Sequence, residues 1–207
     1  MGELLTTLQG QLAAFSVSEV IAVVLAIAYL VLVIRQNILC WVCAIISSGI
    51  YVWLFIDAKL YMESLLYLFY VGMAVYGWRS WAKGGRSGSD LPVVFWPGKT
   101  HAIAIVVILS LATVSGFLLE RYTDAAYPYI DSITSFAAVW GTFLVARKVF
   151  ENWWYWLVID VASVFIYWER GLELTALLFV LYVALIPVGM LQWMRSARQQ
   201  TAAEAGA

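Results

Sequence analysis

Long apolar stretches separated by short polar segments run through most of the chain. A helix that crosses a bilayer needs roughly 20 mostly apolar residues, because each residue adds about 1.5 Å along the axis. Seven stretches come within a few residues of this length. We therefore predict seven membrane-spanning helices, over Ser18–Ile34, Asn37–Ile56, Leu60–Trp81, His101–Leu119, Asp131–Ala146, Val149–Trp168 and Leu172–Trp193.

The polar segments define the remaining parts of the chain. Residues 82–100 contain several glycines and two prolines, so we expect a loop there. Residues 101–130 hold a linking helix and a polar outer loop. Residues 1–17 form an N-terminal segment, with a short amphipathic helix expected over Leu4–Phe15. Residues 194–207 are polar and Ala-rich, and we expect this tail to fray.

Composition favours the same class of protein. Hydrophobic residues make up 64% of the 207 residues and charged residues only 12%, whereas soluble domains are about half apolar and a quarter charged. The net charge of −1 does not suggest nucleic-acid binding. Met1–Gln11 contains no Lys or Arg, so we expect the first helix to be retained rather than cleaved as part of a signal peptide.

The positive residues predict an orientation, because Lys and Arg are enriched on the cytoplasmic side of membrane proteins. Nine of them fall on one side of the predicted spans, namely Arg35, Arg79, Lys83, Arg86, Lys99, Arg147, Lys148, Arg195 and Arg198. Only Lys59, Arg121 and Arg170 fall on the other. We therefore expect the C-terminus in the cytoplasm and the N-terminus outside.

An internal repeat is visible when the chain is shifted by 112 residues. Glu19–Trp81 then aligns with Asp131–Trp193 without a gap, and 14 of 63 positions are identical. The identities include residues that an apolar composition does not readily match by chance, namely Arg35 with Arg147, Trp41 with Trp153, Tyr70 with Tyr182, Gly77 with Gly189 and Trp81 with Trp193. We infer two three-helix repeats, over residues 18–81 and 131–193.

The fourth span decides how the repeats are related. Two three-helix units joined directly are inverted in the membrane, and one additional crossing restores a common orientation. The expected fold is therefore an all-α membrane protein with parallel repeats in a three-one-three arrangement, like that of SWEET-type sugar transporters. Parallel repeats are common in transporters, with a site at the repeat interface near the midplane.

The sixth span carries the main candidate site. Asn152, Trp156, Asp160, Ser163 and Tyr167 are separated by three or four residues, which places them on one helix face. A carboxylate near mid-span is costly in lipid and normally faces a polar interior. We interpret this face as a substrate site, in which aromatic rings stack on a flat ligand and Asp160 attracts positive charge.

The repeat supplies an opposing wall. We assign Ser48 and Tyr51 of the second span to it, and Tyr67 and Glu63 of the third. Trp41 and Trp153 complete the candidate set, although Trp153 is also typical of an interfacial aromatic belt. Glu63 has a second interpretation as well, as a charge at the outer interface.

The sequence does not suggest an enzyme or a cofactor. Cys40 and Cys43 form a single CxxC inside an apolar run, which is typical of small buried residues rather than of a redox or metal site. His101 is distant in sequence from both cysteines, so we expect no metal site and no cofactor.

Several of these segments resemble the PnuC-type vitamin transporter family. The resemblance covers about Glu19 to Trp193 and rests on Asn37-Ile38-Leu39-Cys40-Trp41, Leu60-Tyr61, Leu65-Leu66, Phe69-Tyr70, Tyr76-Gly77-Trp78, Trp81, Ala146-Arg147-Lys148, Glu151-Asn152-Trp153, Trp156, Gly189 and Trp193. It implies a homotrimeric, seven-span carrier in a bacterial inner membrane. It also implies facilitated diffusion of nicotinamide riboside, with the substrate trapped by a cytosolic kinase.

The resemblance leaves the vitamin open. Family members often carry Gln at the position of Tyr67, and they vary between Asn and an acid at Asp160. Nicotinamide riboside and thiamine both carry a fixed positive charge on a flat ring, which suits Asp160 and an aromatic cage. Neutral riboflavin fits this charge less well. A membrane-embedded ligand sensor is the non-transporting alternative.

Overall fold

The computed structural model describes residue 10 and residues 16–57, 61–84, 90–124 and 127–205, without the side chains of residues 61–63, 204 and 205. Its described helices are α2 (Val17–Ile34), α3 (Cys40–Asp57), α4 (Tyr61–Lys83), α5 (Gly98–Tyr122), α6 (Pro128–Ala146), α7 (Asn152–Glu169) and α8 (Glu173–Ala205). The predicted all-α class is confirmed. The amphipathic helix expected over Leu4–Phe15 lies outside the described residues, and so does Lys59, which we expect on the outer side.

Local signals explain several of the boundaries. Ser16 caps α2, because its hydroxyl accepts a hydrogen bond from the backbone N–H of Glu19 while the Glu19 carboxylate accepts one from the backbone N–H of Ser16. Pro128 begins α6, where its missing N–H costs no helical hydrogen bond. Five helices, α2, α3, α5, α6 and α8, are long and apolar enough to cross a membrane.

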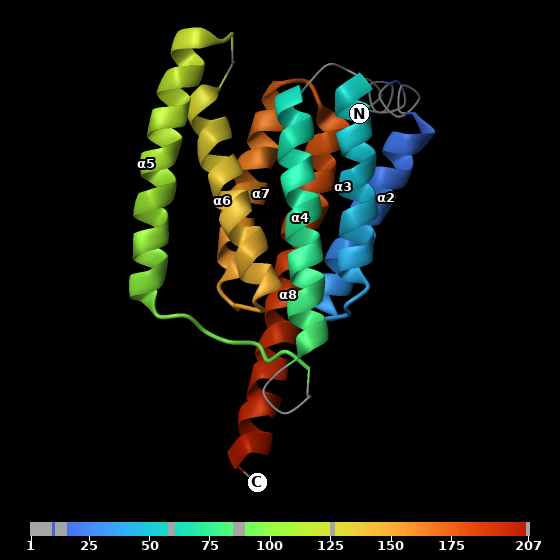
Figure 1. Cartoon of the computed structure of the whole chain (residues 1–207), viewed down its shortest axis with the longest axis vertical. Helices are drawn as coiled ribbons and strands as arrows, with labels where there is room; N and C mark the ends of the chain where they lie inside the picture. The colour runs from blue at the N-terminus through green and yellow to red at the C-terminus, as the bar shows by residue number, and fades with distance from the viewer. Residues whose placement is uncertain (1–9, 11–15, 58–60, 85–89, 125–126, 206–207) are drawn as a thin grey trace.

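Six of the described helices form a closed ring. The packing partners are α2 with α3, α3 with α4, α4 with α6, α6 with α7, α7 with α8, and α8 with α2. The helix α5 stands outside this ring and packs along α6 (Figure 1). Small residues permit that contact, since Ala112 is buried in it and Gly116 lies against the Tyr129 ring.

Four buried tryptophans form the core at the end of the ring where α8 leaves it, which we call the inner end. Trp41 meets Trp81 edge to face at 5.5 Å between ring centroids, and Trp153 meets Trp193 in the same way at 5.4 Å. Trp81 and Trp193 also contact each other at 6.5 Å. Aromatic pairs in such geometry contribute about 0.5–1.5 kcal/mol beyond their buried area.

The tryptophans also join the ring at the two seams where its three-helix halves meet. Trp81 of α4 donates its indole N–H to the backbone carbonyl of Val145 in α6, at 3.3 Å. Trp193 of α8 donates to the carbonyl of Val33 in α2, at 2.9 Å. Each seam is therefore bridged by a buried hydrogen bond.

The last helix is longer than the sequence suggested. We expected a span ending near Trp193 and a fraying tail, whereas α8 continues to Ala205. Its extension projects beyond the ring (Figure 1) and contacts the segment before α5. Gln200 accepts a hydrogen bond from the backbone N–H of Val93, and Ala197 is buried. These contacts stabilise the extra helical turns.

The segment before α5 is ordered rather than a simple loop. Val94 donates its backbone N–H to the carbonyl of Lys148, and its own carbonyl accepts the N–H of Phe150. This short parallel bridge attaches residues 90–97 to the connection between α6 and α7.

Gly77 of α4 allows the Trp41 ring to pack directly against the backbone of that helix. The Trp41 ring lies so near Gly77 that an added Cβ would overlap it. We therefore expect Gly77→Ala to lower the free energy of unfolding by about 1–3 kcal/mol, the usual cost of overpacking. Gly72→Ala on the same helix is the matched control, because nothing lies within 4 Å of its added Cβ. Thermal unfolding in detergent measures both, and equal melting temperatures for the two variants would contradict the prediction.

Candidate functional site

A cavity of about 390 Å³ lies inside the ring of six helices. This volume falls within the range of about 300–1,000 Å³ typical of small-molecule sites. All six ring helices contribute to its wall, and no described residue of α5 does. The lining residues are Ala26, Tyr29, Leu30, Val33, Trp41, Ala44, Ser47, Ser48, Tyr51, Tyr67, Tyr70, Ala74, Thr134, Ser135, Ala138, Thr142, Val145, Trp153, Trp156, Ile159, Asp160, Ser163, Tyr167, Phe179, Tyr182 and Ile186.

The candidate face of α7 borders this cavity. Trp156, Asp160, Ser163 and Tyr167 all line it, as their helical spacing predicts. Asp160 is only 4% exposed, and its carboxylate has no hydrogen bond or ion pair with any residue that the structure describes. It is also the one ionisable acid or base other than tyrosine in the lining. The wall therefore presents a buried carboxyl group that lacks a partner among the described residues.

Aromatic side chains from both halves of the helix ring form the cavity walls near the end opposite the inner end, which we call the outer end. Tyr51 contacts Tyr67 at 4.8 Å between ring centroids, while Tyr167 stacks on Phe179 at 5.3 Å and an angle of 10°. Tyr182 meets Phe179 edge to face. These walls offer flat surfaces to a planar ligand.

The cavity ends on the tryptophan core at the inner end. Trp41 and Trp153 line it and are each only 1% exposed. Their position makes them its floor rather than members of an interfacial belt. Ser48 lines the cavity on α3, at the position 112 residues before Asp160.

Two predicted site residues are not placed in the cavity wall. Asn152 is fully buried at the start of α7, where its amide donates to the backbone carbonyl of Val149 at 2.6 Å. It lies beside the tryptophan core and does not line the cavity. Glu63 belongs to α4, but its side chain lies outside the described part of the structure.

Sequence reasoning missed the hydroxyl-bearing wall on α6. Thr134, Ser135 and Thr142 line the cavity there, with Ala138 between them. The spacing of Thr134, Ala138 and Thr142 by four residues is a helical stripe of small residues that would have indicated an inward face. Tyr29 of α2 was also missed, because its helix is apolar on every side.

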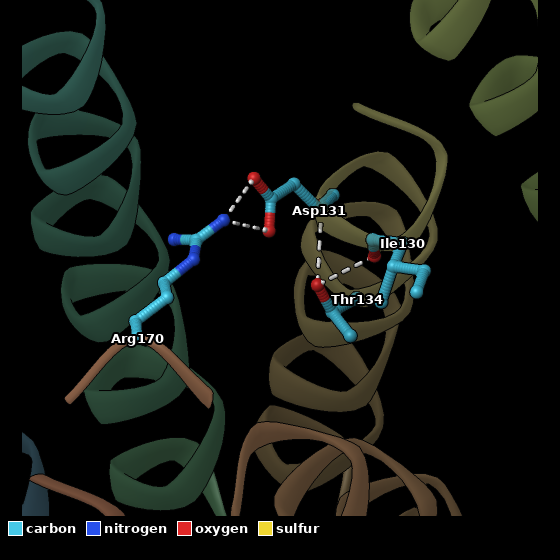
Figure 2. Close-up of polar contacts among 4 residues, drawn as sticks. All are labelled: Ile130, Asp131, Thr134 and Arg170. Carbon is cyan, nitrogen blue, oxygen red and sulfur yellow. Dashed lines mark hydrogen bonds and ion pairs between the residues drawn. The ribbon is translucent and has the colours of Figure 1, made fainter. Parts of the chain in front are cut away.

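The outer rim is held less tightly than the floor. Figure 2 shows Arg170, after α7, pointing toward Asp131 in the first turn of α6, and the two make an ion pair at 3.1 Å. Their side chains are 33% and 41% exposed, so the pair contributes at most about 1 kcal/mol. One turn below, the Thr134 hydroxyl donates to the carbonyls of Ile130 and Asp131, which leaves its oxygen able to accept at the cavity wall.

Comparison with known proteins identifies the family. The model of the nicotinamide mononucleotide transporter family matches residues 16–195, which include the whole ring apart from the end of α8. The chain belongs to this family. The predicted resemblance to PnuC-type transporters is thereby confirmed.

The names of relatives point to different substrates. This chain is 23% identical over 172 residues to the nicotinamide riboside transporter PnuC of Escherichia coli, and the match covers 71% of this chain and 72% of that protein. It is 24% identical over 136 residues to the riboflavin/roseoflavin transporter RibM of Streptomyces davaonensis, covering 63% of each. A crystal structure of the vitamin B3 transporter PnuC superposes with a TM-score of 0.70 at 21% identity, covering 95% of this chain and 90% of that one. That likeness supports the fold.

Gly141 on α6 sets the width of the cavity beside Trp156. A Cβ added there would lie 3.2 Å from the Trp156 ring. We expect Gly141→Ala to push the indole into the cavity by a few tenths of an ångström and to weaken ligand binding by up to about tenfold, equivalent to ~1.4 kcal/mol. Gly49→Ala on α3 is the control, because nothing lies within 4 Å of its added Cβ. Calorimetric titration measures both, and unchanged affinity in Gly141→Ala would show that this wall does not limit the ligand.

Proposed function

We propose that this chain carries nicotinamide riboside across a bacterial inner membrane by facilitated diffusion. The observation that carries the proposal is the Asp160 carboxyl group, which has no partner among the described residues and lies in an aromatic cavity at the centre of the ring. Membership of a transporter family and the names of several relatives support it. No catalytic role is part of the proposal.

The ligand chemistry follows from the charge of the wall. Nicotinamide riboside has a flat pyridinium ring with a permanent positive charge, a carboxamide and a ribose. Near Asp160 the pyridinium supplies the missing counter-charge, which offsets the cost of burying both ions. Trp156 stacks on the same ring through a cation–π contact of roughly 2 kcal/mol when water is excluded. The hydroxyls of Ser48, Ser163 and Thr142 bond to the ribose and carboxamide.

Riboflavin is the second candidate, because the RibM protein is among the relatives. Its isoalloxazine ring is flat and would stack on the tyrosine walls. It is neutral, however, so it offers no counter-charge to the Asp160 carboxyl group. Thiamine also has a fixed positive charge and would suit the same cavity wall. A comparison of binding affinities must therefore distinguish thiamine from nicotinamide riboside.

The proposed architecture is two parallel three-helix repeats, residues 18–81 and 131–193, with α5 as the additional crossing and α4 and α7 counted as spans. Corresponding positions 112 residues apart support it. Trp41 lies on Gly77 as Trp153 lies on Gly189, and the indole bonds of Trp81 and Trp193 have carbonyl acceptors that are also 112 residues apart.

The cellular setting completes the proposal. The charge distribution favours a cytoplasmic C-terminus and an outer N-terminus. The family resemblance favours a homotrimer and a cytosolic kinase that phosphorylates the imported riboside. Phosphorylation then maintains the inward gradient without coupling to an ion.

Transport in liposomes tests the uniport part of this proposal. We expect nicotinamide riboside to equilibrate across vesicles that contain the purified protein, and a pH gradient to leave the rate unchanged while the membrane potential is clamped. The riboside should accumulate only when a kinase and ATP are enclosed. Collapse of uptake on adding a proton carrier to kinase-free vesicles would contradict uniport. Binding without any flux would indicate a sensor.

Replacement of Asp160 tests which ligand the cavity binds. We expect Asp160→Asn to weaken binding of nicotinamide riboside by at least about tenfold, equivalent to ~1.4 kcal/mol, because the pyridinium loses its counter-charge. The uncharged dihydropyridine form of the same riboside should lose less than about threefold. Asp57→Asn is the matched control, since Asp57 is exposed at the end of α3 and outside the lining.

Calorimetry with both forms, and with thiamine and riboflavin alongside, gives the answer. Equal loss for the charged and uncharged forms would make Asp160 a structural residue. Tight binding of riboflavin alone would replace the substrate and leave the fold unaffected.

A further inference from the structure

A lysine is buried directly beneath the floor of the cavity. Lys148 lies in the short connection between α6 and α7 and is only 3% exposed. Its ammonium group lies 4.6 Å from the centre of the Trp81 ring and donates to the side-chain oxygen of Gln36 at 3.2 Å. Because Gln36 and Trp81 belong to the first half of the ring and Lys148 to the second, these contacts join the halves.

Both connections at this point adopt an unusual backbone. Gln36 has a φ of 53° and Lys148 a φ of 49°, in the left-handed region that non-glycine residues rarely occupy. Such conformations cost about 1–3 kcal/mol each and cluster at functional switches. The two residues are 112 positions apart, so corresponding points of the two halves touch here.

The burial of Lys148 is only partly compensated. No ion pair to its ammonium is found among the described residues, and burial lowers the pKa of Lys148 from its ordinary value. The ammonium is held by one amide oxygen and one indole face, and the charge of Asp90 also favours its charged form. Such a cation gains hydration whenever the contact opens.

We propose that Lys148, Gln36 and Trp81 form the inner gate of the transport path. The gate opens when the Lys148 ammonium leaves the Trp81 ring and the indole bond from Trp81 to Val145 breaks, which separates α4 from α6 below the cavity. The inference rests on the proposed carrier function. The weaker, half-exposed Asp131–Arg170 pair at the outer rim is consistent with a structure that is closed more firmly at the inner end.

The chain contains its own reporter of this opening. Cys40 is fully buried in the same cluster as Trp41, Trp81 and Trp193. The chain has two cysteines, and the other, Cys43, is partly exposed. In a Cys43→Ser background, the rate at which N-ethylmaleimide labels Cys40 therefore measures how often the inner end opens.

The experiment compares three variants in full-length protein reconstituted in liposomes. Gln36→Ala and Trp81→Phe remove partners of the gate, so Cys40 labelling should accelerate at least tenfold. Lys148→Met keeps the side-chain length and removes the cost of burying a charge, so labelling should slow and transport should slow while ligand affinity is retained. Lys99→Met, at an exposed lysine in the first turn of α5, is the matched control and should change neither rate.

Melting temperature and ligand binding are measured for every variant, because a variant that unfolds would also label faster. If Trp81→Phe unfolds, Gln36→Ala, at a residue in a connection between helices, remains as the test. Identical labelling rates in all variants would overturn the proposal, and so would faster labelling in Lys148→Met, which would make Lys148 a structural clamp. Labelling requires no substrate. Failure of nicotinamide riboside transport would therefore leave the gate test valid, and failure of the gate test would leave the transport result valid.

Discussion

Two indole N–H groups hold the ring of helices together where its halves meet. Trp81 and Trp193 each reach across a seam to a backbone carbonyl, and the carbonyls belong to Val145 and Val33. A buried polar group that loses its partner costs about 1–3 kcal/mol, and more where no water can replace it. The seams therefore close in a defined register. This closure separates an interior from lipid, and the site depends on that separation.

The interior of the helix ring can hold polar side chains that would be unfavourable in lipid. Asp160 would be costly on a lipid-facing surface, whereas inside the ring it lies among tyrosines, a tryptophan and hydroxyl groups. The wall combines one carboxyl group with many flat or weakly polar surfaces. Such a wall suits the ligand proposed above, which is flat, charged at one point and hydroxylated elsewhere.

Periodicity predicted much of the site because the polar residues in the middle of α7, Asp160 and Ser163, lie on one face. Trp156, Asp160, Ser163 and Tyr167 were located from spacing alone, and all four line the cavity. The same rule placed Asn152 with them, but that residue begins the helix, and its amide bonds to Val149 at the preceding turn. The spacing of residues along a helix shows which face they share, but it does not show which of them lie level with the cavity.

Other parts of the site were beyond the reach of pattern reasoning. The inward position of Tyr29 depends on how α2 packs against α3 and α8, and an apolar helix has no marked face. The length of α8 was missed because polar, Ala-rich residues resemble a frayed end, whereas Gln200 bonds to Val93. The role of Glu63 stays a prediction.

The ring has a consequence for the order in which the protein is built. Within each half, the packed helices are neighbours along the chain, so these contacts form early and at small entropic cost. The contact between α2 and α8 joins the two ends of the ring instead. During synthesis it must wait until the last helix has entered the membrane, and until then the carbonyl of Val33 lacks the indole that it accepts from. A nascent chain therefore has an open, lipid-accessible interior through most of its assembly, and the final helix converts it into a sealed compartment in one step.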